Sequence, residues 1–287
     1  MFYSDKNIPN LLGECPLWCW RTSRLFWVDI VRSELHAKHF HSGSTRRWSL
    51  PEQIGSFAMT SDDNILLLGM ESSLAYFDLS TERLSKIAAS PGQERTRIND
   101  GRCDRFGNFI FSTMHQGQPP EAVGAFFRLN AETLSIERLP LAEVAIPNSI
   151  CFSPDGGTMY YCDSLQGKIM RCDYPSFENQ RIFTHVEGGG APDGSCVDAD
   201  GYVWNAEWGG SRVVRYRPDG TVDRKLSSPA IQMTCPVIGG AELDTLFCTT
   251  ARVWLESPHD SDGSLHISQD AVNQGLREAI FAGRLTI

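Results

Sequence analysis

The sequence lacks the cysteine spacings that mark a disulfide framework or a structural zinc site. Nine cysteines are present, which is an odd number, and no two of them form a Cys-x-x-Cys pair. Small secreted domains that depend on disulfides carry even numbers of cysteines at regular spacings. We therefore expect reduced thiols and a cytoplasmic protein.

Long apolar runs and an excess of positive charge are also missing. The longest aliphatic run, residues 65–70, is much shorter than the ~20 residues that cross a bilayer. The N-terminal stretch carries Asp5 and Lys6 and lacks the apolar region of a secretion signal. Lysine and arginine total 26 against 35 aspartates and glutamates, a net charge of −9. We expect neither a membrane nor a nucleic-acid partner, and the oligomeric state stays open.

A period of 3.6 residues is almost absent, but a longer repeat is present. Segments 99–107, 148–156 and 193–201 each place an oxygen-bearing residue eight positions before a glycine, and a β-type run follows. Weaker copies begin at residues 14, 55 and 235, so successive starts are 41 to 49 residues apart. This spacing is typical of a four-stranded propeller blade. We predict an all-β, six-bladed β-propeller that forms a single domain over residues 1–287.

Equivalent positions on the innermost strands of a propeller form a ring around its central channel. The repeat predicts that this ring contains Glu14, Gly55, Asn99, Asn148, Asp193 and Cys235. Four of these residues bring side-chain oxygens to one small volume, where carboxylates would repel one another without a cation. Asn-Asp-Gly and Pro-Asp-Gly are also common turn sequences. Their equivalence across blades favours one divalent metal ion, namely Ca²⁺, Mg²⁺, Mn²⁺ or Fe²⁺, with Zn²⁺ possible.

Several motifs follow one another at the propeller spacing. They are Leu12-Gly-Glu-Cys-Pro-Leu-Trp18, Arg97-Ile-Asn-Asp-Gly101, Pro147-Asn148 and Pro192-Asp-Gly-Ser-Cys-Val-Asp198. In these motifs the chain resembles the senescence marker protein / gluconolactonase / regucalcin family, from about Leu12 to Gly283. The resemblance implies a six-bladed propeller that hydrolyses sugar lactones with one divalent metal ion.

The resemblance also implies roles for single residues. Glu14, Asn148 and Asp193 match the family's metal ligands. Arg97 matches a substrate-binding arginine, and Asn99 matches a position that contacts the substrate or lies at the outer side of the metal. Two positions depart from the family pattern, Cys15 and Ile238.

Two further roles come from the chemistry of the residues themselves. Lactone hydrolysis needs a polarised carbonyl, a nucleophilic water and a stabilised oxyanion. Asp193 is the candidate general base as well as a ligand, and the alternative is a ligand that moves no proton. Arg97 would hold ring hydroxyls or the developing anion, and the alternative is a salt bridge at the rim. His115 follows a predicted strand and is a candidate substrate-binding residue at the pocket mouth, or simply a solvated loop residue.

The predicted function is thus metal-dependent hydrolysis of a sugar lactone, a small molecule, to the open-chain aldonic acid. One alternative keeps the propeller and its metal but acts on phosphotriesters or aryl esters. A second alternative is a calcium-binding regulator without turnover. The sequence does not select among glucono-, galactono-, arabinono- and xylonolactone, because these differ by one hydroxyl group or its configuration.

Overall fold

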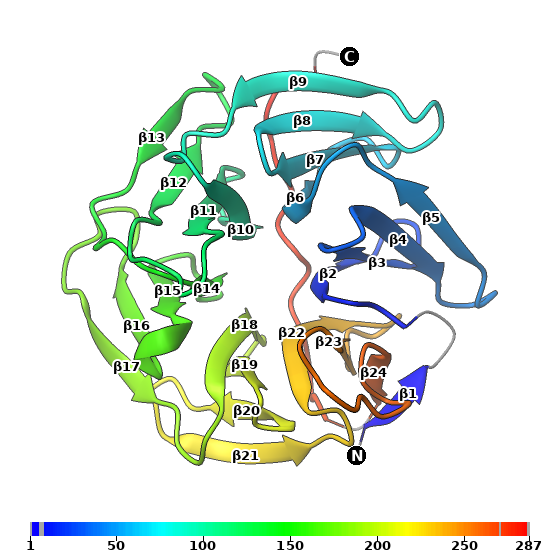
Figure 1. The fold of residues 1–287 in the computed structure, drawn as a ribbon, viewed down its shortest axis with the longest axis vertical. Helices are drawn as coiled ribbons and strands as arrows, with labels where there is room; N and C mark the ends of the chain where they lie inside the picture. The colour runs from blue at the N-terminus through cyan, green and yellow to red at the C-terminus, as the bar shows by residue number, and fades with distance from the viewer. Residues whose placement is uncertain (1, 6–8, 270, 286–287) are drawn as a thin grey trace.

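The strands of the protein form six four-stranded antiparallel sheets arranged as blades around a central axis (Figure 1). The computed structural model describes residues 2–5, 9–269 and 271–285. The prediction of an all-β, six-bladed propeller is confirmed, and the extent of the single domain stays a prediction. The described residues contain no helix long and apolar enough to cross a membrane.

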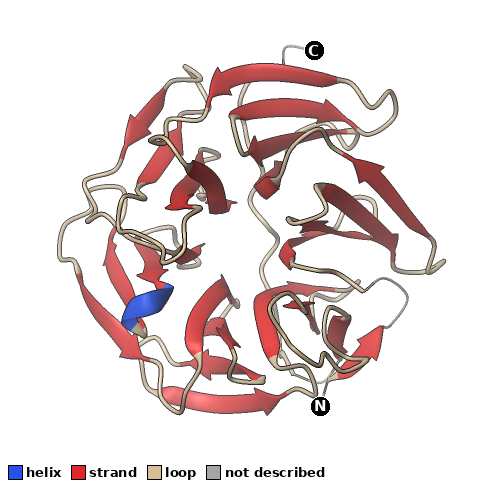
Figure 2. Ribbon diagram, in the orientation of Figure 1, coloured by secondary structure: helices blue, strands red, loops and turns tan. Residues whose placement is uncertain are grey.

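Each of the first five blades consists of four consecutive strands, numbered from the axis to the rim. Blade 1 contains β2 (Gly13–Cys19), β3 (Arg24–Asp29), β4 (Glu34–His39) and β5 (Thr45–Ser49). Blade 2 contains β6 (Ile54–Met59), β7 (Ile65–Met70), β8 (Ser73–Asp78) and β9 (Leu84–Ala89). Blade 3 contains β10 (Thr96–Cys103), β11 (Phe109–His115), β12 (Phe126–Leu129) and β13 (Ile136–Arg138). Blade 4 contains β14 (Pro147–Phe152), β15 (Thr158–Asp163), β16 (Lys168–Asp173) and β17 (Arg181–His185), with the short 3₁₀ turn η1 (Ser164–Gln166) after β15 (Figure 2). Blade 5 contains β18 (Ala191–Val197), β19 (Val203–Trp208), β20 (Arg212–Tyr216) and β21 (Val222–Ser227).

Blade 6 closes the ring by combining strands from both ends of the sequence. It consists of β22 (Gln232–Gly239), β23 (Thr245–Ala251), β24 (Leu265–Ser268) and, as its outermost strand, β1 (Tyr3–Asp5). Tyr3 pairs with Ile267 in this sheet. The inner strands pack beside one another in the order β2, β6, β10, β14, β18 and β22, and β22 packs against β2. The ring is therefore complete.

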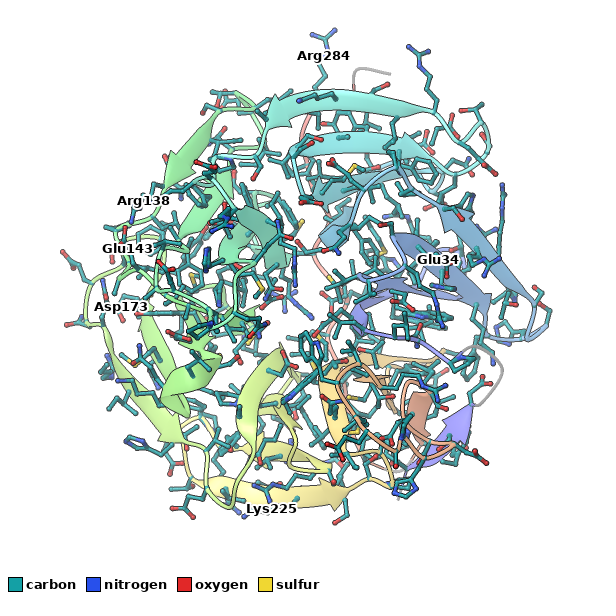
Figure 3. All side chains as sticks on the ribbon, in the orientation of Figure 1. Glu34, Arg138, Glu143, Asp173, Lys225 and Arg284 are labelled. Carbon is teal, nitrogen blue, oxygen red and sulfur yellow. The ribbon has the colours of Figure 1, made fainter. Side chains whose placement is uncertain are left out.

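Burial decreases from the axis to the rim. Every residue of the inner strands β6 and β14 is buried, whereas the outer strand β21 contains no buried residue. The inner strands are covered on both faces by neighbouring blades, so polar as well as apolar side chains of these strands are buried. At the outer edge, Asp173, Lys225 and Arg284 extend away from the axis (Figure 3). The polar side chains that remain near the axis therefore need a specific explanation.

The two ends of the central channel are built differently. We call the end where the inner strands begin the upper end, and there Thr96 lies opposite His115 and Ala191 opposite Trp208. Residues 271–285, which we call the C-terminal strap, cross the disc from the side of β22 to the side of β9 (Figure 1). The strap is bound to the turns of the lower end, where the backbone N–H of Ala282 donates to the carbonyl of Gly107 over 2.9 Å. The C-terminal strap therefore covers part of the lower end, whereas no described segment crosses the disc in this way at the upper end.

Candidate metal and substrate site

Every inner strand carries a shift of its pairing register near the upper end. The shifts lie between residues 14 and 17 in β2, 54 and 56 in β6, 98 and 101 in β10, 148 and 151 in β14, 192 and 195 in β18, and 233 and 236 in β22. Such bulges redirect side chains and are frequent beside functional sites. All six predicted ring residues lie at or inside these bulges, namely Glu14, Gly55, Asn99, Asn148, Asp193 and Cys235. The structure thus brings them to one level of the channel.

The inner strands approach one another closely at this level. A Cβ atom at Gly55 would lie 2.0 Å from the carbonyl oxygen of Ile98 on the next inner strand. A Cβ atom at Gly194 would lie 2.4 Å from the Sγ atom of Cys235. Glycine is therefore required at both positions by the packing of neighbouring backbones. The polar ring residues at this level therefore lie between closely packed inner strands.

Asp193 is a buried carboxyl group and Glu14 a partly buried one, and their charges repel each other. Burial raises the pKa of Asp193 well above its usual range, and the charges of Glu14 and Asp100 raise it further. Burial raises the pKa of Glu14 to about 8, opposed by the backbone N–H of Cys15, which donates to Oε2 over 2.7 Å. Within the described part of the chain, neither carboxyl group forms an ion pair with lysine or arginine. The charge of Arg97 lowers the pKa of Glu14 by less than burial raises it, so no cationic side chain keeps both carboxyl groups ionised.

Asn148 is held so that its oxygen remains available. Its Nδ2 atom donates to Oγ of Ser164 in η1 over 3.0 Å, and Ser164 donates in turn to the carbonyl of Pro192 over 2.7 Å. The Oδ1 atom of Asn148 accepts a hydrogen bond from Nδ2 of Asn99 over 3.3 Å, which leaves one of its lone pairs for a ligand. These two hydrogen bonds fix the orientation of the amide.

Arg97 and Asn99 form a second pair on β10. Nη1 of Arg97 donates to Oδ1 of Asn99 over 2.8 Å, and Nδ2 of Asn99 donates to the carbonyl of Pro147 over 2.8 Å. The oxygen of Asn99 is thus already engaged, which suits a substrate contact better than a metal ligand. Burial lowers the pKa of Arg97 to about 10, while the charges of Glu14 and Glu71 oppose this change. Arg97 is only 8% exposed, unlike the rim salt bridge considered as its alternative.

His115 is at the upper end but is enclosed by the loop that follows it. The side chain is 7% exposed, and its Nδ1 atom accepts a hydrogen bond from the backbone N–H of Glu121 over 3.2 Å. A Cβ atom at Gly117 would lie 2.4 Å from the imidazole ring, so this glycine packs directly on it. The alternative of a solvated loop residue is therefore wrong. The predicted contact of His115 with substrate stays a prediction.

Two residues near the ring were missed by sequence reasoning. Asp100 accepts hydrogen bonds from the backbone N–H groups of Gly101 over 2.8 Å and Ile150 over 2.7 Å, and so joins β10 to β14. Asn205 donates from Nδ2 to the carbonyl of Asp193 over 3.1 Å and fixes the backbone there. Asp100 was not predicted because the Asn-Asp-Gly motif is typical of a turn. Asn205 lies on β19, the second strand of its blade, and the sequence repeat identified candidate residues only on the first strands.

The arrangement fits a hard divalent cation. Two carboxylates and one amide oxygen are ligands that Ca²⁺, Mg²⁺ and Mn²⁺ favour. A cation would also remove the repulsion that raises the pKa of Asp193. Among the described residues, no group of three His, Cys, Asp or Glu side chains is placed to hold a metal ion. The amide of Asn148 is therefore needed to complete the predicted set of ligands.

All nine cysteines are free and buried, as expected for reduced thiols. Burial raises the pKa of the ring residue Cys235 far above its usual range, with the charge of Glu14 adding to the shift. The thiolate is the form that binds metals and reacts as a nucleophile. The protonated Cys235 thiol therefore adds no further negative charge to the ring.

The fold and the site together define a six-bladed β-propeller whose inner strands carry carboxyl groups, amides and an arginine near one end of the channel. Residues 12–252 match the family model described as SMP-30/Gluconolactonase/LRE-like region, and the chain belongs to this family. The family predicted from the sequence motifs is thereby confirmed.

Three similar proteins illustrate this membership. The L-arabinolactonase of Azospirillum brasilense is 44% identical over 285 residues, which cover 96% of this chain and 93% of the relative. The 6-deoxy-6-sulfogluconolactonase of Pseudomonas putida is 32% identical and covers 96% of both chains. The crystal structure of a calcium-binding protein, regucalcin, from Agrobacterium tumefaciens has a TM-score of 0.91 at 30% identity and covers 99% of this chain and 98% of its own.

Proposed function

We propose that the protein hydrolyses a sugar lactone to the open-chain aldonic acid with a divalent metal ion held by Glu14, Asn148 and Asp193. The observation that carries this proposal is the pair of mutually repelling carboxyl groups from blades 1 and 5, neither of which forms an ion pair among the described residues, together with the hydrogen-bonded amide of Asn148 on the inner strand of blade 4. The expected enzyme class, a hydrolase of lactone esters, is confirmed by relatives named as lactonases. The metal, the sugar and the roles of single residues are the proposal.

The bound ion would supply Lewis acidity to the lactone carbonyl. Asp193 accepts the proton of the attacking water, because its carboxylate lies among the ligands and its backbone is held by Asn205. Arg97 donates hydrogen bonds to the oxygens of the ring and stabilises the negative charge that develops on the carbonyl. Asn99 keeps Arg97 in this orientation through their shared hydrogen bond.

The test is acid release from a panel of aldonolactones in weakly buffered solution. Each lactone hydrolyses slowly in water, so the rate without protein is subtracted at every pH. We expect acid release with Ca²⁺, Mn²⁺, Mg²⁺ or Zn²⁺ present and none above background after chelation. Unchanged background rates across the whole panel with every metal would disprove the proposal.

A second candidate function is calcium binding without turnover. It is favoured by the similarity to the calcium-binding regucalcin of Agrobacterium tumefaciens and to the regucalcin of Xenopus laevis. Calorimetric titration with Ca²⁺ separates the two candidates when it is combined with the lactone panel. Tight Ca²⁺ binding together with a silent panel would favour this second candidate.

A further inference from the structure

A polar cleft of about 530 Å³ opens between blades 2 and 3 at the upper end of the propeller. Its walls come from the turn after β7, the segment before β10 and the residue after β11. The residues that matter here are Glu52, Glu71, Ser72, Arg95, Thr96 and Gln116. None of them belongs to the predicted ring, so the cleft is an addition to the central site.

The cleft shares a wall with the substrate side of the central site. Thr96 lines the cleft and directly precedes Arg97 on β10. Gln116 follows His115, and its Nε2 atom donates to Oε1 of Glu71 over 3.0 Å. The charge of Glu71 also acts on the guanidinium of Arg97. The cleft therefore lies at the start of β10, next along the strand to Arg97, and the charge of Glu71 reaches that arginine.

The chemistry of the lining selects for hydroxyl groups. Carboxylates accept hydrogen bonds, the Gln116 amide both donates and accepts, and a hydroxyl group satisfies either kind of partner. Glu52 and Glu71 outnumber the one guanidinium, of Arg95, so the lining has a net negative charge. An anionic substituent is disfavoured there, whereas a neutral, hydroxylated chain is not.

We propose that this cleft is a subsite for the exocyclic polyol arm of the lactone and that Glu71 is a specificity-determining residue that binds a hydroxyl group of that arm. The inference rests on the proposed function, since it needs a lactone ring at Arg97. It follows that lactones whose arm carries two hydroxylated carbons gain a contact that lactones with a one-carbon arm lack.

Two substrates isolate this contact. L-Arabinono-1,4-lactone and D-galactono-1,4-lactone have the same ring configuration and differ by one CHOH group in the arm. The variant is Glu71→Ala, and the matched control is Glu82→Ala, an exposed glutamate at the edge of the same blade. We expect Glu71→Ala to lower kcat/KM for the galactonolactone at least about tenfold more than for the arabinonolactone, as for the loss of one hydrogen bond to a charged group. Glu82→Ala leaves the ratio of the two kcat/KM values unchanged.

A second variant tests the cleft without altering charge at Arg97. Gln93→Trp places a large side chain in the lining, and we expect loss of the galactonolactone rate with the arabinonolactone rate retained. Thermal melts verify that each variant is folded. Three results would each overturn the proposed subsite. Glu71→Ala could lower both rates equally, or both variants could leave the ratio of the two rates unchanged. The wild-type protein could also open only the arabinonolactone. If the wild-type protein opens no lactone of the panel, the proposed function itself has failed.

Discussion

The guanidinium of Arg97 and the amide of Asn99 form one buried unit, because Nη1 of Arg97 donates to Oδ1 of Asn99 over 2.8 Å and neither residue is more than 9% exposed. The same nitrogen donates to the carbonyl of Ile98 over 2.9 Å. The unit therefore presents the remaining donors of Arg97 in a fixed direction.

Removal of the Arg97 guanidinium is expected to weaken the stabilisation of the transition state, which is measured as kcat/KM. Arg97→Ala removes charge-assisted hydrogen bonds of about 1.5–3 kcal/mol, which corresponds to roughly 10- to 150-fold in kcat/KM. Metal affinity, measured by titration, is expected to change little. A parallel loss of metal affinity would show that Arg97 supports the ligands and not the substrate. Arg46→Ala, at the exposed edge of blade 1, serves as the control.

Asp193→Asn separates a ligand from a general base, because it keeps one ligand oxygen and the side-chain volume but accepts no proton. If Asp193 is the base, kcat stays about 10²–10⁴-fold below wild type even when excess metal fills the site. Occupancy is verified by titration, and the uncatalysed rate is subtracted. Recovery of most of the rate at full occupancy would leave Asp193 as a ligand only.

Chelation is expected to abolish turnover and leave the propeller folded. The blades are joined by apolar layers, such as the one in which Trp48 of blade 1 and Phe77 of blade 2 pack edge to face. These layers do not involve the predicted ligands. Far-ultraviolet circular dichroism before and after chelation checks this expectation, and a lost β-type spectrum would contradict it.

The metal-free protein is expected to lose stability as the pH rises toward 8. The folded state holds a proton on Glu14 up to about pH 8, whereas the unfolded chain releases it near the ordinary value of 4.5. The contribution of Glu14 is thus present below pH 4.5 and is lost progressively up to about pH 8. Denaturation of wild type and Glu14→Gln with chelator at several pH values measures it. The difference cancels groups that do not interact with Glu14, such as His36, whose buried ring has its pKa lowered to about 4.

The difference between the two proteins has a definite sign. Wild type should become less stable relative to Glu14→Gln as the pH increases from 6.5 to 8. A constant difference over this interval would mean that Glu14 is ionised throughout and that its burial is relieved by solvent.

The C-terminal strap is expected to contribute to stability through a buried ion pair. Nη1 of Arg102 on β10 lies 2.6 Å from Oε1 of Glu278, and the two side chains are 10% and 11% exposed. Glu278→Ala leaves the arginine charge buried and unpaired, at a cost of about 3–5 kcal/mol in the free energy of unfolding. Urea denaturation measures it. The exposed Glu82 of the pair with Arg46 is the control, and an equally small effect at both positions would contradict the prediction.

Repetition explains which parts of this protein the sequence could predict. The distance of eight residues from Asn99, Asn148 and Asp193 to a glycine reflects an inner strand and its turn, so both the blades and the ring follow from it. The role of Asp100 could not be predicted, because its side chain accepts a hydrogen bond from the N–H group of Ile150 in the next blade. The residues next to Asp100 in the sequence do not indicate this contact. The strap and the cleft between blades 2 and 3 also depend on segments distant in sequence. Such contacts become visible only once the ring has closed.

The position of the strap has a consequence for synthesis of the chain. Its Phe281 N–H donates to the carbonyl of Met59 in blade 2, and β1 near the N-terminus pairs with β24 near the C-terminus. The first and the last segments of the chain therefore both contact residues that are distant in sequence. During translation, blades 1 to 5 emerge as an open arc in which β2 and β18 both lack their neighbour β22. The channel acquires its lower wall, and the last sheet its outer strand, only after nearly all residues have left the ribosome. A ribosome that stalls within blade 6 would therefore release an arc with one apolar flank exposed, a substrate for chaperones and proteases.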